Sequence, residues 1–177
     1  MKDTDQRTSS GSAVSELIVA IFRLNGRLLT SGDRLVASLG LSSARWQVLG
    51  AIAFSPTPEP VARLARNMGL NRQGVQRIVR ELVAEGFVEL KNNPHHRRAR
   101  LVLMTAKGTE AYGAALRLQA PWVNMLGEGF DPKRIEEATR VLEGLRQRLE
   151  QGAPDAADKV SREDDRASAV SRRPSSV

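Results

Sequence analysis

The segment 64–89, "LARNMGLNRQGVQRIVRELVAEGFVE", decides the fold. Gly69 divides it into two short helical stretches, because glycine readily adopts the positive φ that ends a helix. Asn71 is a good N-cap for the second stretch, which we expect to be helical over 72–85, and Gly86 stops it. Two helices joined by a tight glycine-containing turn are typical of a helix-turn-helix.

The second helix of this segment has two chemically different faces. At about 100° per residue, one face is apolar, and the opposite face carries arginine and glutamine: Arg72, Gln73, Gln76, Arg77 and Arg80. Arginine forks onto guanine or phosphate, and glutamine can pair with an adenine edge. The N-terminal part of such a helix reads bases, and its end attracts phosphate. We therefore predict DNA contacts from these residues and Asn71, with Arg80 on phosphate; a merely solvated face is the alternative.

Two strand-like runs follow, over 87–91 and 99–104, joined by a loop over 92–98. A helix-turn-helix followed by a hairpin predicts a winged helix-turn-helix. The hairpin tip is basic, and an arginine there can enter a narrow minor groove. We assign DNA contacts to the polar residues of this tip: His95, His96, Arg97, Arg98 and Arg100. A metal site is disfavoured, because the histidines are adjacent, no cysteine is present and the arginines oppose a cation.

The net charge of +7 is concentrated around these motifs. Residues 60–100 carry 9 Lys and Arg against 3 Asp and Glu, an excess of +6. Residues 1–59 carry 6 against 5, residues 101–151 carry 7 against 7, and residues 152–177 carry 5 against 5. A basic surface confined to one stretch attracts polyanions and speeds encounter with them.

The rest of the chain predicts a mainly α protein with a small β-hairpin wing. Apolar residues recur at helical spacing over 13–38, and further helices are expected from Ser42, from Thr105 to about 127, and over 132–151. Pro60 suits the first turn of a third helix, and Pro121 should kink or split the fifth. We expect a DNA-binding core over 42–104, with dimerisation helices over 13–38 and 105–151 completing a domain over 13–151.

The two ends and the overall composition exclude several classes of protein. Residues 1–12 and 152–177 are polar and small, so we expect them to be disordered. The absence of cysteine excludes disulfides, a thiolate nucleophile and a thiol redox switch. No apolar run reaches the ~18 residues of a membrane span. With no secretory signal, no nucleophile motif and no phosphate loop, we expect a cytoplasmic protein that is not an enzyme, needs no cofactor and contacts no membrane.

The sequence resembles the MarR family of bacterial transcription regulators. The family's wing pattern, Asp-x-Arg-x-x-x-Val-x-Leu-Thr-x-x-Gly, aligns with "HRRARLVLMTAKG", matching at Arg98, Val102, Thr105 and Gly108. Met104 replaces the leucine, and His96 replaces the aspartate. The stretches "SSARWQVLGAI" and "LARNMGLNRQGVQRIVRELVAEGFVE" also look like the family's second to fourth helices, and the likeness covers about residues 14–150.

The resemblance implies a homodimer that binds a pseudo-palindromic double-stranded operator, as a ligand-responsive repressor. The sixth helix supports assembly through a heptad-like seam spaced 3, 4, 3, 4: Ile135, Ala138, Leu142, Leu145 and Leu149. A seam packed within the same chain is the alternative. A winged helix that binds proteins without binding DNA is the alternative function, although its face should then be more apolar.

The resemblance also implies a pocket for a small aromatic or anionic effector between the dimerisation helices and the DNA-binding core. Arg45 and Trp46 at the start of the second helix could supply a cation and a ring to it. Phe22 and Tyr112 are further candidates, and each of the four can instead belong to the core or the surface. The operator, the regulated genes, the effector and the sign of regulation do not follow from the sequence.

Overall fold

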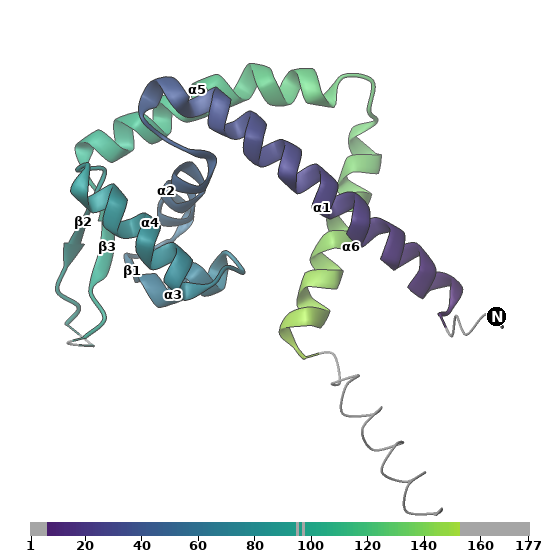
Figure 1. The fold of residues 1–177 in the computed structure, drawn as a ribbon, viewed down its shortest axis with the longest axis horizontal. Coiled ribbons are helices and arrows are strands. Elements are labelled where there is room, and N and C mark those ends of the chain that lie inside the picture. The colour runs from purple at the N-terminus through teal and green to yellow at the C-terminus, as the bar shows by residue number, and fades with distance from the viewer. Residues whose placement is uncertain (1–6, 95, 97, 153–177) are drawn as a thin grey trace, which may run out of the picture. The chain divides into compact units, whose positions relative to one another are not determined.

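The computed structural model describes residues 7–94, 96 and 98–152. It divides into two units, residues 1–126 and residues 127–177, and each is described by itself. Within the described residues the first unit is mainly helical and carries a small sheet (Figure 1). Its elements, in order, are α1 (Ser9–Val36), a short 3-10 turn (Ala37–Leu39), α2 (Ser43–Phe54), β1 (Glu59–Pro60), α3 (Val61–Asn67), α4 (Arg72–Ala84), β2 (Val88–Lys91), β3 (Leu101–Met104) and α5 (Ala106–Gly127).

The first helix begins earlier than the sequence predicted. α1 starts at Ser9, so the expectation of disorder through residue 12 is wrong for residues 9–12. The cause is local: the Thr8 hydroxyl accepts a hydrogen bond from the Gly11 amide at 3.0 Å and so caps the helix N-terminus. Residues 1–6 and 153–177, on which the other disorder predictions fall, lie outside the described residues.

The predicted helix-turn-helix is present, with the expected caps. Gly69 has φ +64° in the turn, and the Asn71 side chain accepts from the Gln73 amide at 2.8 Å to start α4. Gly86, with φ +77°, follows the end of α4. Pro60 is the N-cap of α3 rather than part of its first turn, because its ψ of 154° is extended and it still pairs in β1.

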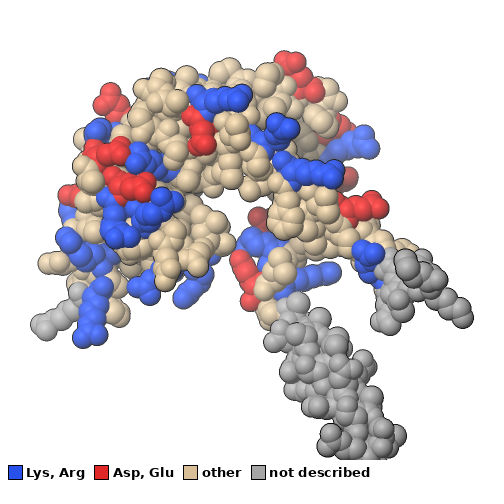
Figure 2. All heavy atoms as spheres, viewed as in Figure 1, with Lys and Arg blue, Asp and Glu red and all other residues tan. Residues whose placement is uncertain are grey.

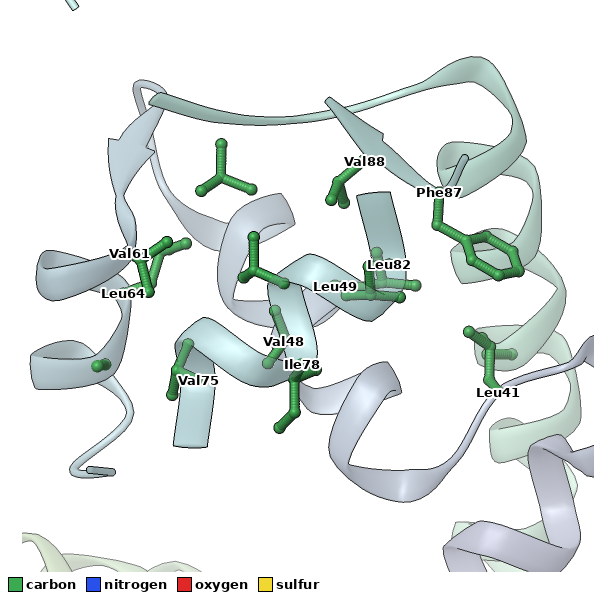
Figure 3. Close-up of a cluster of buried hydrophobic side chains, with 14 of the residues drawn as sticks. Leu41, Val48, Leu49, Val61, Leu64, Val75, Ile78, Leu82, Phe87 and Val88 are labelled. Atoms are coloured by element: carbon green, nitrogen blue, oxygen red, sulfur yellow. The ribbon is translucent and has the colours of Figure 1, made fainter. Parts of the chain in front are cut away.

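One hydrophobic core holds this region together. Figure 3 shows side chains from α2, α3, α4 and the strand region converging on one another. Val48 and Leu49 of α2 meet Val75 and Leu82 of α4 within this core, and all four are essentially inaccessible to solvent. Burying side chains of this size contributes about 1.5–3 kcal/mol each, so the apolar face of α4 is anchored and its polar face is left outside.

The wing is a three-stranded antiparallel sheet in the order β1–β3–β2, as far as the described residues extend. Val88 pairs with Met104, and Lys91 pairs with Leu101. β3 begins at Leu101 and not at the predicted residue 99, because the Ala99 amide turns back to the His96 carbonyl at 3.0 Å. In Figure 1 the β2–β3 hairpin extends away from the helices beside α4.

The sheet is joined to α5 by a close backbone approach. The Thr105 hydroxyl donates to the Gly86 carbonyl at 2.7 Å and accepts from the Gly108 amide at 3.1 Å. A Cβ at Gly108 would collide with the carbonyl oxygen of Phe87, so only glycine fits there. α5 continues through Pro121, which therefore does not split it.

The second unit contains α6 (Pro132–Glu150). Asp131 caps this helix by accepting from the Lys133 amide at 3.0 Å, and Pro132 occupies its first turn, as the sequence predicted. None of the described residues of α6 is buried within the chain. Among the described residues, no helix combines the length and the apolar character that a membrane span requires.

Candidate nucleic-acid interface and effector cavity

The polar face of α4 is exposed and basic, because the opposite face is committed to the core. Arg72, Gln73 and Arg80 are exposed, and together with the half-buried Gln76 they line a shallow surface hollow. In Figure 2, Lys and Arg side chains gather over the hairpin and the lower part of the α4 region in this view, and acidic side chains lie among them higher up. The first turn of α4 contains no acidic residue, so the helix dipole there is free to favour an anion.

Arg77 lies apart from that hollow and is engaged within its own helix. Its Nη1 lies 3.3 Å from Glu81 Oε1, one turn further along α4. Arg77 is nevertheless mostly exposed, and an exposed pair of this kind is worth little in water. The guanidinium can therefore exchange Glu81 for another acceptor.

Arg45, which was predicted as an effector residue, is not among the residues that line the cavity described below. Its guanidinium instead binds two acidic residues at the C-terminal end of α4. Nη2 lies 3.3 Å from Glu81 Oε2 and 2.7 Å from Glu85 Oε1. The start of α2 packs beside the end of α4, and this neighbour, 36 residues away in sequence, was not visible from helical spacing.

The described histidine and arginines of the wing tip are exposed, and one of these arginines braces the hairpin. His96 and Arg98 are exposed, whereas Arg100 Nη2 donates to the Leu90 carbonyl at 2.6 Å across the hairpin. His95 and Arg97 lie outside the described residues. Within the described part of the chain, no three potential metal ligands come together.

A cavity of about 720 Å³ lies within the first unit, between faces of α1, α2 and α5. Four aromatic side chains line it: Trp46, Phe54, Tyr112 and Trp122. Three amide side chains, Asn25, Gln47 and Gln119, add hydrogen-bonding groups. Among the described residues that line this cavity, none carries a charge.

Two of the four predicted effector residues, Trp46 and Tyr112, line this cavity. Phe22 does not line the cavity; it lies on α1 and is 72% exposed. Gln119 and Trp122 also line this cavity and were not among the predicted residues. The spacing 4, 3, 3 from Tyr112 through residue 116 to these two places them on one face of α5 and could have identified them.

The cavity reaches the helix-turn-helix at Met68. This residue is the C-cap of α3, directly before the turn, and its half-buried side chain lines the cavity. A molecule bound in the cavity would therefore touch both the long helices and the element that positions α4.

The fold and the exposed basic face define a winged helix-turn-helix protein. A family model described as MarR family matches residues 39–99. An uncharacterized protein of Mycobacterium tuberculosis is 35% identical over 127 residues, covering 72% of this chain and 87% of the relative. The transcriptional activatory protein BadR of Rhodopseudomonas palustris is 28% identical over 118 residues, covering 64% of this chain and 67% of BadR.

Solved structures share the fold. The M. tuberculosis transcriptional regulator MOSR, solved in complex with DNA, superposes with a TM-score of 0.64 at 20% identity, covering 75% of this chain and 96% of MOSR. The chain belongs to the MarR family of transcription regulators. The family consists of regulators and not enzymes, in agreement with the expectation from the sequence.

Proposed function

We propose that this protein is a sequence-specific regulator that binds double-stranded DNA through α4 and the wing. The observation that carries the proposal is the exposed face of α4, where Arg72, Gln73, Gln76 and Arg80 surround one hollow. Their forked cationic and amide groups match guanine, adenine and phosphate. Arg77 joins them when it leaves Glu81, and Asn71 places the helix N-terminus toward a phosphate.

The wing supplies a second contact in this proposal. Arg98 and His96 are exposed at the tip, and His95 and Arg97 are its neighbours in sequence. Because Arg100 is bonded to the Leu90 carbonyl, its role is to hold the hairpin as well as to add charge near the DNA. The +6 charge excess of residues 60–100 covers both α4 and the wing.

The regulator acts as a homodimer on a pseudo-palindromic operator. Large apolar side chains are exposed on α1 and α5 of the first unit and, separately, on α6: Ile18, Val19, Phe22, Leu24, Leu28, Leu116, Leu118, Val123, Met125, Leu126, Ile135, Val141, Leu142 and Leu149. So much exposed apolar surface is typical of a protein–protein interface. A twofold assembly would present two α4 helices to two half-sites.

The proposal is tested with a duplex from the DNA flanking this gene and a shuffled duplex of equal composition. The wild-type protein should prefer the first, and its log K should fall linearly as log salt rises. Arg72→Ala with Arg77→Ala should weaken operator binding by about 1–3 kcal/mol for each base-reading arginine removed.

The matched control is Arg23→Ala with Arg27→Ala, which removes the same charge from exposed positions of α1. Equal operator binding by the wild type and the α4 double variant would overturn the assignment of α4. If the protein binds neither duplex but binds other proteins, the chain is instead a winged-helix protein-interaction module.

We further propose that the regulator is a repressor that responds to a ligand: binding of a small effector releases the protein from DNA. The cavity of about 720 Å³ touches α1, α2, α5 and Met68. Its lining of rings and amides, without a charged group among the described residues, favours an uncharged aromatic effector over an anionic one. Arg45, which could have served an anion, is bound to Glu81 and Glu85.

A thermal-shift screen of paired aromatic amides and aromatic carboxylates tests this preference. The neutral member of each pair should raise the melting temperature and release the operator duplex. Trp46→Ala should abolish both effects, since a ring of the cavity is removed. Phe130→Ala, which removes an exposed ring that does not line the cavity, should abolish neither. Stabilisation by the carboxylates alone would contradict the preference for an uncharged ligand.

A further inference from the structure

Arg45 is the most heavily engaged cation among the described residues of α2 and its neighbours. Its Nη1 lies 3.0 Å from Glu85 Oε2 and also donates to the Gly40 carbonyl at 3.3 Å. Its Nε and Nη2 both face Glu81 Oε2, at 3.4 and 3.3 Å. The side chain is only 21% exposed. A forked guanidinium with several partners is held far more firmly than an isolated surface pair.

Glu81 passes this constraint on to the DNA-facing side of α4. One carboxylate oxygen, Oε2, accepts from Arg45, and the other, Oε1, pairs with Arg77 at 3.3 Å. The orientation of the carboxylate is therefore set from α2. The carboxylate in turn biases the resting position of Arg77, which stays free to exchange Glu81 for an acceptor on DNA. Arg45 is also tied to the α1–α2 junction through Gly40.

The same interactions neutralise acidic residues that would otherwise oppose DNA. Glu81 and the C-cap Glu85 are the acidic residues of α4 and its end. Unpaired carboxylates about a Debye length from a phosphate backbone reduce its attraction to the helix. Lys107 of α5 adds a further cation here by donating to the Glu85 carbonyl at 2.7 Å.

We propose that Arg45 is a positioning residue for DNA recognition: it neutralises Glu81 and Glu85 and fixes the carboxylate that holds Arg77. Arg45 touches no base in this arrangement and acts through α4. The inference rests on the proposed DNA-binding function. It assigns to Arg45 a role in reading the operator instead of a role in the effector cavity.

The test compares operator and shuffled duplexes across a salt series. Arg45→Met should weaken binding to both by about three- to tenfold, because two screened carboxylates are released near phosphates. The slope of log K against log salt should stay unchanged, since removing a side chain that binds phosphate directly would reduce its magnitude by about 0.9. Arg27→Met, which removes the same charge from an exposed site on α1, should change neither quantity appreciably.

A rescue variant separates positioning from general damage. Adding Glu81→Gln and Glu85→Gln to Arg45→Met removes the released charges, so affinity for the shuffled duplex should return to the wild-type value. The preference for the operator should stay reduced, because Arg77 no longer has its carboxylate partner. Arg45→Lys keeps the charge but cannot fork onto two carboxylates. Shuffled-duplex affinity should stay near the wild-type value, whereas the operator preference should fall because the Glu81 carboxylate is no longer fixed. This variant also covers the case in which Arg45→Met does not fold.

Each outcome has a distinct meaning. Wild-type protein that binds no duplex removes the proposed function and this inference together. Wild-type binding that is unaltered in Arg45→Met overturns the inference alone. A reduced salt slope in Arg45→Met also overturns it, because Arg45 would then bind phosphate directly. Failure of the glutamine substitutions to restore shuffled-duplex affinity would reduce Arg45 to a purely structural residue.

Discussion

α4 and α6 carry the same kind of apolar stripe in sequence but use it differently. In α4 the stripe is buried within its own unit, and Leu82 is 0% exposed. In α6 the corresponding leucine, Leu142, is 42% exposed, and none of the described residues of the helix is buried. Both helices are capped in the same way by a side chain that accepts from a backbone amide of the first turn.

The difference lies in the neighbours and not in the pattern. α4 is surrounded by α2, α3 and β2, which follow or precede it closely in the chain and pack against it. Its polar face is consequently the free one and is available to a ligand. The apolar seam of α6 includes the exposed leucines Leu142 and Leu149, and in the proposed homodimer this seam binds the second copy of the protein.

The largest effect on stability should come from shortening a side chain in the buried apolar stripe of α4. Leu82→Ala should lower the free energy of unfolding by about 2–5 kcal/mol, the usual cost of a cavity in a packed core. Leu142→Ala is the matched change on the exposed stripe and should cost under about 1 kcal/mol at concentrations where the protein is monomeric. Urea denaturation at two protein concentrations measures both. Equal losses for the two variants in the dilute sample would contradict the contrast between the helices.

A charge in the seam of α6 should alter assembly more than stability. Leu145→Asp should convert the proposed dimer to a monomer and weaken operator binding with it, because a carboxylate cannot be buried unpaired at an interface. Gln147→Asp, on the other side of the same helix, introduces the same charge and should leave the dimer intact. Sedimentation at micromolar concentration decides the matter. A wild-type monomer, or a Leu145→Asp dimer, would show that the seam is not an interface.

The smallest effects should come from a glycine in each helix. A Cβ at Gly74 in α4 or at Gly144 in α6 would meet no atom within 4 Å. Alanine at either site should therefore raise helix stability by about 0.5–1 kcal/mol. Gly74→Ala should also weaken operator binding, because the added methyl group stands on the proposed DNA face, whereas Gly144→Ala should not. Improved DNA binding by Gly74→Ala would argue against a close approach of DNA at that position.

Much of the fold followed from local chemistry. Asn71, Gly69 and Gly86 specify the ends of α4 through capping and positive φ, so the helix-turn-helix was predictable from a single stretch. The hairpin was predicted, but its length was not. Ala99 belongs to the tip because its amide bonds to His96. The start of α1 was missed because a single hydroxyl, on Thr8, extends the helix into a polar segment.

The candidate sites divide in the same way. Periodicity alone placed Arg72, Gln73 and Arg80 on the outer face of α4, because a helix with one buried stripe has only one free side. The contacts of Arg45, in contrast, depend on tertiary packing. It sits next to Trp46 in sequence, yet Trp46 lines the cavity and Arg45 binds α4.

The sequence by itself thus determined the order and type of the main helices and of the hairpin, the ends of α4, the basic face of α4 and the family. Only the tertiary structure decided which residues far apart in the chain meet: Arg45 with Glu81 and Glu85, and Gly108 with the Phe87 carbonyl. The physical reason is range. Capping and amphipathic spacing act within a few residues and can be seen along the chain, whereas an ion pair between two helices depends on how their buried faces pack, which no local pattern encodes.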